Sequence, residues 1–292
     1  MKKLTDCFEL SNGVKVPCLG FGTYLSPTGE ITKNAVLEAL KVGYRHIDTA
    51  LAYGNEASVG EAIKESGIPR EEIFVTTKHW VTDRGYEKAK AAIDQSLANL
   101  GLEYMDLYLI HWPCEEKVSP EWAEINASTW KAFEEAYKEG KIKAIGVSNF
   151  QKKHIDALDA LCEIKPMVNQ IEFHPGYLQM DTVKYSQDYG MLVQAFSPLG
   201  CGAVLQDETL AALAAKYNKS VAQICLRFVL QSGINVLSKS VTPSRIFENT
   251  QIFDFELSAE DMEVIANMPQ VGFTGWLPEE APADAVAAAN AK

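Results

Sequence analysis

The sequence predicts an α/β protein, a single (β/α)8 TIM barrel with an N-terminal β-hairpin cap and a C-terminal loop and tail. Eight short apolar segments that are typical of strands alternate with amphipathic helical stretches along the chain. These segments are nearly continuous apolar runs, as expected for parallel strands covered on both faces. The first strand–helix turn, at residues 20–25, lacks the third glycine of a dinucleotide-binding fingerprint. This disfavours the alternative fold, an open doubly wound sheet.

The chain begins with a predicted β-hairpin. Residues 8–10 and 14–17 are strand-like, and the Ser11-Asn12-Gly13 sequence between them is typical of a tight turn. After the hairpin, we expect the barrel strands at residues 19–21, 45–48, 74–77, 105–110, 144–148, 168–171, 192–196 and 235–237.

Helical periodicity separates most of these strands. Residues 30–42 form one amphipathic segment with an apolar stripe. Asn55 predicts the N-cap of a second helix. The Ser-Pro sequence at 119–120 and the Thr-Pro sequence at 242–243 each predict an N-cap followed by proline at the first helical position.

Composition and charge limit the possible functions. Of the 292 residues, 47% are hydrophobic and 23% are charged, which is ordinary for a globular protein with a large core. The formal net charge of −12, from 27 basic and 39 acidic side chains, disfavours nucleic acid as a partner. No apolar stretch approaches the ~18 residues of a membrane span, and none of signal-peptide length follows the N-terminal lysines. We therefore expect a cytoplasmic protein without a membrane partner, and a monomer by default.

No internal repeat, low-complexity block or Pro/Gly-rich linker divides the chain. One domain is therefore predicted over residues 1–292, in which periodicity is lost from residue 271 and residues 271–292 form a loop and a mobile tail. The six cysteines include no C-x-x-C pair, which indicates reduced thiols. Cys114, close to His111 in the sequence, is a candidate nucleophile, but packing is the favoured interpretation because no base with an orienting group is evident nearby.

In a barrel of this type, reactive side chains lie at the carboxyl ends of the strands. Most of the predicted strands end in polar residues. Taken singly, each of them has a structural interpretation as a helix cap, a surface residue or a buried polar group. Together they converge on one barrel mouth. The polar residues are Asp48 with Tyr53 in the following loop, Lys78, His111, Ser148, Asn149, Gln170, Ser197, Lys239 and Ser240, and apolar Phe196 precedes Ser197 at the same mouth.

Asp48, Tyr53, Lys78 and His111 form a set that allows a phenol to donate a proton. An unperturbed tyrosine has a pKa of about 10 and holds its proton too tightly at neutral pH. A lysine ammonium beside the phenol would lower that pKa, and an aspartate would hold the lysine charged. A neutral histidine could orient a carbonyl oxygen. Protonation of that oxygen implies that the carbon receives another group, and hydride from a nicotinamide fits this requirement.

Residues 239–245 predict an anion site that suits a dinucleotide phosphate. Lys239, Ser240, Thr242 and Arg245 lie within this short segment, at a predicted helix start. The alternative interpretation is an ordinary helix cap.

A metal-dependent hydrolase is disfavoured, and no metal site is expected. The five histidines, at positions 46, 79, 111, 154 and 174, include no H-E-x-x-H or H-x-H spacing. His46 shares strand parity with Asp48 and is interpreted as an interior packing residue.

These residues lie in motifs that resemble the aldo-keto reductase family, in particular its bacterial and protozoal NADPH-dependent branch of diketogluconate reductase-like and prostaglandin F synthase-like enzymes. The resemblance covers nearly the whole chain. It rests on Gly22-Thr23, GYRHIDTALAYGNE at 43–56, Thr77-Lys78, LIHWP at 109–113, GVSNF at 146–150, NQIEFHP at 169–175, FSPLG at 196–200 and KSVTPSRIFEN at 239–249.

The resemblance implies an enzyme that reduces aldehydes or ketones, such as small carbonyls, dicarbonyls or keto sugars, to alcohols with NADPH. It implies a catalytic set of Asp48, Tyr53, Lys78 and His111, with Tyr53 as the general acid. The cofactor-binding residues that it implies are Gly22, Thr23, Asp48, Ser148, Asn149, Gln170, Phe196, Ser197, Leu199, Lys239, Ser240, Val241, Thr242, Arg245, Glu248 and Asn249. The alternative is a nucleotide-binding regulatory or structural member of the same fold family with little or no turnover.

Aromatic residues near the strand ends predict a sheltered substrate pocket. Tyr24, Trp80, Trp112 and Trp276 are expected to line it together with His111, because aromatic walls exclude water around a transferred hydride. Core packing is the alternative interpretation of Trp80 and Trp276.

Three positions depart from the family pattern. Ser238 stands where the family usually has proline, and Phe196 replaces a tyrosine or tryptophan found in some branches. His79 precedes Trp80 where many relatives carry an aliphatic residue, which could alter the pocket wall.

Overall fold

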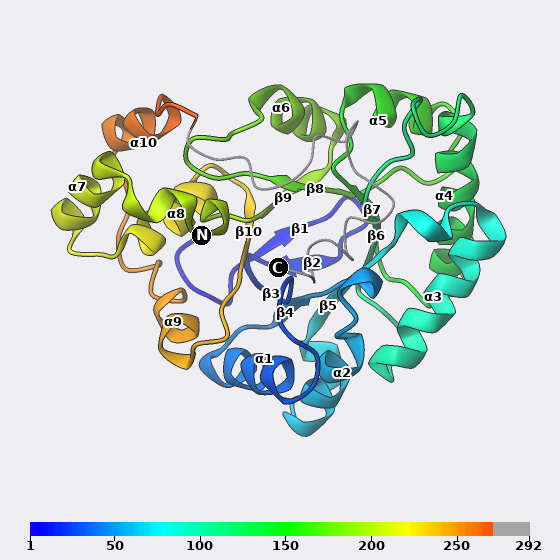
Figure 1. Ribbon diagram of the computed structural model, residues 1–292, viewed down its shortest axis with the longest axis horizontal. Helices are drawn as coiled ribbons and strands as arrows, with labels where there is room; N and C mark the ends of the chain where they lie inside the picture. The colour runs from blue at the N-terminus through cyan, green and yellow to red at the C-terminus, as the bar shows by residue number, and fades with distance from the viewer. Residues whose placement is uncertain (271–292) are drawn as a thin grey trace.

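The computed structural model describes residues 1–270 of the chain. Trp276 and the predicted loop and tail at residues 271–292 lie outside the described residues. Within residues 1–270, eight parallel strands close into a barrel in the order β10-β3-β4-β5-β6-β7-β8-β9 (Figure 1). Their bounds are β3 (Leu19–Gly22), β4 (His46–Asp48), β5 (Phe74–His79), β6 (Leu107–Ile110), β7 (Ile145–Ser148), β8 (Val168–Glu172), β9 (Leu192–Phe196) and β10 (Asn235–Ser238).

The predicted barrel is confirmed, and the open doubly wound sheet is wrong. Closure depends on β10, in which Val236 pairs with Leu19 of β3 on one side and with Ala195 of β9 on the other. Every predicted strand is present, with its ends shifted by at most two residues. This agreement is expected because buried parallel strands are short apolar runs that the sequence displays directly.

Helices surround the barrel (Figure 1). The α-helices are α1 (Glu30–Val42), α2 (Glu56–Glu65), α3 (Tyr86–Leu100), α4 (Trp122–Lys138), α5 (Lys152–Asp159), α6 (Met180–Tyr189), α7 (Glu208–Tyr217), α8 (Val221–Gln231), α9 (Pro243–Glu248) and α10 (Ala259–Ala266). Short 3-10 helices are η1 (Leu51–Tyr53), η2 (Arg70–Glu72), η3 (Val81–Asp83) and η4 (Gly200–Gln206). None of the helices in residues 1–270 combines the length and the apolar character that crossing a bilayer requires.

The predicted helix starts have three different outcomes. Thr242 is the N-cap of α9 and is followed by proline, as predicted. Asn55 occupies the N-cap position of α2, but its side chain does not cap the helix. The start at residues 119–120 is wrong, because α4 begins at Trp122 and the Ser119 hydroxyl accepts a hydrogen bond from the Glu121 amide in a local turn.

The N-terminal hairpin, β1 (Cys7–Glu9) and β2 (Lys15–Pro17), closes the end of the barrel where the strands begin. The Cys18 amide, just before β3, donates to the Asp6 carbonyl over 2.9 Å. At the turn, Asn12 Nδ2 donates to the Lys143 carbonyl, just before β7, over 3.0 Å. The hairpin is thus fixed to the amino-terminal ends of the strands, and the carboxyl ends remain for a functional site.

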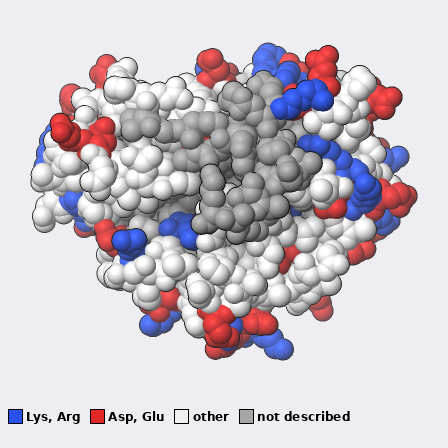
Figure 2. Space-filling model, in the orientation of Figure 1, with Lys and Arg blue, Asp and Glu red and all other residues white. Residues whose placement is uncertain are grey.

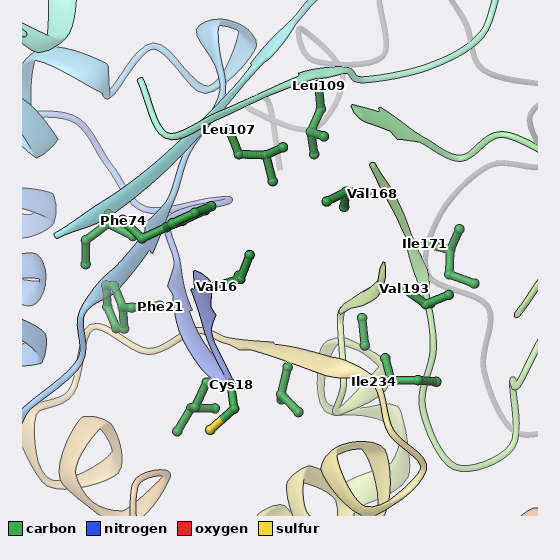
Figure 3. Close-up of a cluster of buried hydrophobic side chains, with 14 of the residues drawn as sticks. Val16, Cys18, Phe21, Phe74, Leu107, Leu109, Val168, Ile171, Val193 and Ile234 are labelled. Atoms are coloured by element: carbon green, nitrogen blue, oxygen red, sulfur yellow. The ribbon is translucent and has the colours of Figure 1, made fainter. Parts of the chain in front are cut away.

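Apolar side chains from most of the strands belong to one large buried core. Figure 3 shows Phe21, Leu107, Val168 and Val193 within one cluster, with Val16 of the hairpin beside them. All of these side chains are buried. This packed core holds the strand ends in fixed relative positions.

Charged side chains lie mostly around the periphery of the face shown in Figure 2, where acidic and basic groups are interspersed. Ion pairs such as Lys141–Asp94 and Lys152–Asp156 connect some of the surface charges. Exposed pairs of this kind contribute little to stability, so the fold depends chiefly on the buried apolar core.

Candidate active site

A buried ion pair joins two neighbouring strands at the carboxyl end of the barrel. Asp48 is the last residue of β4. It pairs in register with Thr76 of β5, and Lys78 lies two residues further along that strand. The Lys78 ammonium donates to Asp48 Oδ1 over 2.5 Å and to the Thr49 carbonyl over 2.8 Å. Lys78 is fully buried and Asp48 is 4% exposed, so both charges depend on these contacts.

The protonation of Lys78 reflects two opposing effects. Burial lowers the pKa of its ammonium group, whereas the charges of Asp48 and Glu56 raise it. Glu56 is itself buried and accepts hydrogen bonds from Thr77 Oγ1, over 2.6 Å, and from Asn99 Nδ2, over 2.8 Å. Two carboxylates therefore favour the charged form of this lysine.

Tyr53 lies above the ion pair, at the end of η1. Its ring centroid is 5.2 Å from Lys78 Nζ, and its hydroxyl is 3.5 Å from His111 Nε2. We expected Lys78 to lower the pKa of the phenol, but burial raises it well above the usual value, with further contributions from Asp48 and Tyr24. Tyr53 is therefore protonated at neutral pH, which is the form that a general acid requires.

His111 follows β6 and contacts both Tyr53 and the pocket wall. Its ring packs edge-on against Trp80, with centroids 5.0 Å apart, and its carbonyl accepts a hydrogen bond from Asn149 Nδ2 over 2.9 Å. Burial, with smaller effects of Lys78 and His79, lowers the pKa of His111 well below its usual value. The imidazole is therefore neutral and can donate one hydrogen bond while it accepts another.

The segment that follows His111 is held by side chains from two other elements. Asn126 of α4 accepts from the Cys114 amide over 2.8 Å and donates to the Cys114 carbonyl over 3.2 Å. Arg84 donates to the Pro113 carbonyl over 2.7 Å. The Cys114 side chain is buried, and burial raises the pKa of its thiol, which favours packing over a nucleophilic role.

Ser148, Asn149 and Gln170 form a polar cluster at the ends of β7 and β8. Ser148 Oγ donates to the Gln170 carbonyl over 2.8 Å and accepts from Asn149 Nδ2 over 3.1 Å. Asn149 adopts a left-handed backbone with φ of 63°, which asparagine tolerates better than most residues. Gln170 Nε2 donates to Asp48 Oδ2 over 2.9 Å, so this cluster is directly bonded to the ion pair.

The other predicted cofactor residues lie at the ends of β3, β9 and β10. Gly22 pairs with Asp48, and the Thr23 hydroxyl donates to the Asp48 carbonyl over 3.1 Å. Phe196 is half-buried at the end of β9. Ser197 has a left-handed φ of 48°, and half-buried Leu199 follows in the same loop.

After β10, the chain places two basic side chains at the same rim. Lys239 Nζ donates to the Leu25 carbonyl over 3.4 Å, and burial lowers the pKa of its ammonium group. Arg245 is exposed in α9, and within residues 1–270 neither of these cations forms an ion pair. Of the remaining predicted residues in this segment, Ser240 and Glu248 are half-buried, Asn249 is buried, and Val241 and Thr242 are exposed.

Aromatic side chains surround Tyr53 and His111. The Tyr24 ring lies 5.1 Å from the Tyr53 ring, centroid to centroid, and Trp80 packs against His111. Trp80 and Trp112 belong to a small apolar cluster that is separate from the main core. Three of the predicted pocket residues thus lie around the proposed reacting groups.

The structure brings together Asp48, Tyr53, Lys78 and His111, as predicted. Sequence analysis missed Glu56 and Gln194. Glu56 stands in the motif that contains Tyr53 and follows the predicted N-cap, so it was interpreted only as part of a helix start. Gln194 is a polar residue two positions before Phe196 in an apolar strand, and that position was the available signal.

A cavity of about 340 Å³ lies at the other end of the barrel. Its lining includes Cys7 and Lys15 of the hairpin and Arg45 and Asp106 near the beginnings of β4 and β6. None of the predicted site residues lines it, so this cavity is distinct from the candidate active site. Within residues 1–270, no group of three or more His, Cys, Asp or Glu side chains is placed to hold a metal ion.

Comparison with known proteins confirms the family resemblance. Residues 18–268 match the Aldo/keto reductase family, and the chain therefore belongs to this family. It is 48% identical over 277 residues to a glyoxal reductase of Bacillus subtilis, a match that covers 95% of this chain and 98% of that protein. It is 46% identical over 263 residues to a 9,11-endoperoxide prostaglandin H2 reductase of Trypanosoma cruzi, covering 89% of this chain and 90% of that protein.

Solved structures show the same fold. A crystal structure of a Bombyx mori aldo-keto reductase in complex with NADP superposes with a TM-score of 0.86 at 36% identity. The match covers 94% of this chain and 95% of that chain.

Proposed function

We propose that this protein is an NADPH-dependent reductase that converts aldehydes and ketones to alcohols. The observation that carries the proposal is the buried Asp48–Lys78 pair beneath Tyr53, whose hydroxyl is 3.5 Å from His111 Nε2. These groups supply a proton donor, a charge that stabilises the phenolate left behind, and a neutral hydrogen-bonding partner for a carbonyl oxygen.

NADPH, when bound, supplies the hydride that the carbonyl carbon receives. Tyr53 donates its phenolic proton to the carbonyl oxygen as negative charge develops there. The raised pKa of Tyr53 does not prevent this transfer, because an alkoxide is a stronger base than a phenolate. His111 holds the carbonyl oxygen near the phenol, and the Lys78 ammonium stabilises the phenolate.

The residues present fit the nicotinamide end of this cofactor. Within residues 1–270, neither Asn149 Oδ1 nor Gln170 Oε1 receives a hydrogen bond, so two acceptor oxygens stand at the proposed amide site beside Ser148. A carboxamide N–H group matches such acceptors. Phe196, half-buried at the end of β9, would offer an apolar surface for the nicotinamide ring.

The proposed dinucleotide site extends along the ends of β3, β9 and β10. Lys239, Ser240 and Arg245 would bind the 2′-phosphate, since two cations that form no ion pair within residues 1–270 lie with a hydroxyl at one rim of an acidic protein. The remaining residues proposed to contact the cofactor are Gly22, Thr23, Ser197, Leu199, Val241, Thr242, Glu248 and Asn249.

Small dicarbonyls are the first substrates that we propose. A relative that is 48% identical is named glyoxal reductase, and the aromatic wall formed by Tyr24, Trp80 and Trp112 suits a compact carbonyl compound. The alternative of a nucleotide-binding protein without turnover is disfavoured because all four proposed catalytic side chains are present and close together.

The proposal extends to the organisation of the chain. One domain over residues 1–292 is supported by the closed barrel and by the family match to residues 18–268. A monomer is supported because one chain supplies all the proposed catalytic side chains. A cytoplasmic location is supported by the six cysteines, all of which are free thiols.

The direct test is NADPH oxidation measured with a panel of glyoxal, methylglyoxal, simple aldehydes, ketones and keto sugars. We expect turnover with at least the dicarbonyls and lower turnover with NADH. NADPH binding without oxidation by any carbonyl in the panel would instead support the regulatory alternative.

A further inference from the structure

A chain of buried amides leads from the interior of the barrel to the ion pair. Gln194 of β9 and Gln170 of β8 are partners in the parallel register of these strands. Gln170 Nε2 donates to Gln194 Oε1 over 3.1 Å and to Asp48 Oδ2 over 2.9 Å. All three side chains are buried, so water does not offer alternative partners.

These contacts fix the orientation of the Gln170 amide. An ionised carboxylate accepts hydrogen bonds and cannot donate them, so the side of Gln170 that faces Asp48 must be its nitrogen. The nitrogen has two N–H groups, and Asp48 and Gln194 occupy both. Gln170 Oε1 is then the one atom of this amide that is available to a ligand.

The side-chain amide of Gln194 has only part of its hydrogen-bonding capacity satisfied. Its Oε1 accepts from Gln170, but within residues 1–270 its buried Nε2 has no hydrogen-bond partner. A buried donor without a partner costs stability, so an apolar side chain of similar size would suit the core at least as well. The contact with Gln170 is therefore the feature that gives this amide a role.

We propose that Gln194 is a positioning residue for the cofactor. By accepting from Gln170 it holds Gln170 Oε1 as an acceptor for the carboxamide N–H of the nicotinamide, on the same amide that bonds Asp48. The inference rests on the proposed function. Gln194 would not touch the cofactor itself. Through Gln170 it would contribute to recognition of the carboxamide N–H.

The test compares the binding of two nucleotides that differ at this group. NADPH carries a carboxamide, whereas its 3-acetylpyridine analogue carries an acetyl group without N–H. Gln194→Met removes the acceptor and keeps the length of the side chain. The measured quantity is the dissociation constant of the acetyl analogue divided by that of NADPH, both obtained by calorimetry. We expect this ratio to fall by about threefold to tenfold in Gln194→Met, the range expected for one neutral hydrogen bond. The affinity for the acetyl analogue should be unchanged.

Asn235 provides a matched control. It is a buried amide that pairs in register with Gln194 on the neighbouring strand, but its Nδ2 donates to the Pro17 carbonyl at the hairpin, over 2.7 Å. Asn235→Leu should leave the ratio at its wild-type value. Gln194→Leu is a second variant without the acceptor. The ratio of dissociation constants is compared in whichever Gln194 variant has the melting temperature of the wild type.

An unchanged ratio in a folded Gln194 variant, or an equal change in Asn235→Leu, would overturn the inference and leave the proposed function intact. A wild-type protein that binds neither nucleotide would overturn both.

Discussion

The Asp48–Lys78 pair shows why the proposed site is sensitive to single residues. Removing two charges from water is costly, and the attraction between them compensates only when further hydrogen bonds satisfy the remaining atoms. Here Asp48 Oδ2 accepts from Gln170, and Lys78 also donates to the Thr49 carbonyl. Loss of either charge leaves the other buried without its partner.

We expect Lys78→Met to destabilise the fold by about 3–5 kcal/mol, because it leaves Asp48 as an unpaired buried carboxylate. The double variant Asp48→Asn/Lys78→Met should recover most of this loss. Both variants should lose reductase activity. Urea unfolding of the two variants and the wild type measures the difference, and a double variant as unstable as Lys78→Met would contradict the account of the pair.

At the scale of single residues, the sequence predicted where the polar side chains gather better than it predicted their environments. Asp48, Tyr53, Lys78 and His111 could be found because the carboxyl ends of barrel strands meet at one mouth. The raised pKa of Tyr53 could not, because it depends on burial by the folded chain. For the same reason Asn55 was interpreted as a helix cap, whereas its Nδ2 donates to the carbonyls of Thr23 and Ser26.

The packing of α2 against α3 depends on one glycine. A Cβ at Gly60 would lie 2.0 Å from the Leu100 carbonyl oxygen, which belongs to the backbone at the end of α3. A backbone atom cannot move away as a flexible side chain can. The two helices can therefore approach this closely only with glycine at position 60.

Gly60→Ala should destabilise the protein by about 1–3 kcal/mol, the usual cost of overpacking, although alanine is the better helix former. Glu61→Ala, on the exposed side of the same helix, is the matched control and should have little effect. Thermal or urea unfolding measures both. An unchanged or increased stability of Gly60→Ala would show that α2 and α3 are not in this contact.

The elements themselves were largely predictable, and the exceptions have local causes. The barrel strands were found because they are buried on both faces and are therefore apolar throughout. The start of α4 was missed because Ser119 forms a turn with Glu121, an arrangement that uses the same residue types as a helix cap.

At the scale of the whole molecule, buried histidines make stability depend on pH. Burial lowers the pKa of His46 to about 3 and that of His79 to about 4, whereas an unfolded histidine has a pKa of about 6.5. Near pH 5 the unfolded chain therefore binds about two more protons than the folded chain at these two positions. Their stabilising effect is complete above pH 6.5 and is lost as the pH falls toward the folded pKa values.

We expect the midpoint of urea unfolding to fall steadily between pH 6.5 and pH 4.5. His79→Phe keeps an aromatic ring against Phe133. In this variant the decrease should be smaller, because one fewer proton is taken up on unfolding. Urea titrations at several pH values measure the slope. A wild-type midpoint that stays constant over this range would contradict the burial of neutral histidines.

The closed barrel also explains how residues distant in the sequence form one site. Asp48, Lys78 and His111 stand on the adjacent strands β4 and β5 and just after β6, while Gln170 reaches Asp48 from β8 across the interior. The order of strands was predictable from the alternation of elements. The contact between Gln170 and Asp48 was not, because it depends on how the barrel curves.

We propose that Tyr53 donates the proton during carbonyl reduction. The most direct measurement is the rate of NADPH oxidation in a single turnover with methylglyoxal, compared between the wild type and Tyr53→Phe at equal cofactor saturation. We expect a rate about 10²–10⁴ times lower in Tyr53→Phe, with the NADPH dissociation constant and the melting temperature essentially unchanged. An equal rate in the two proteins would contradict it.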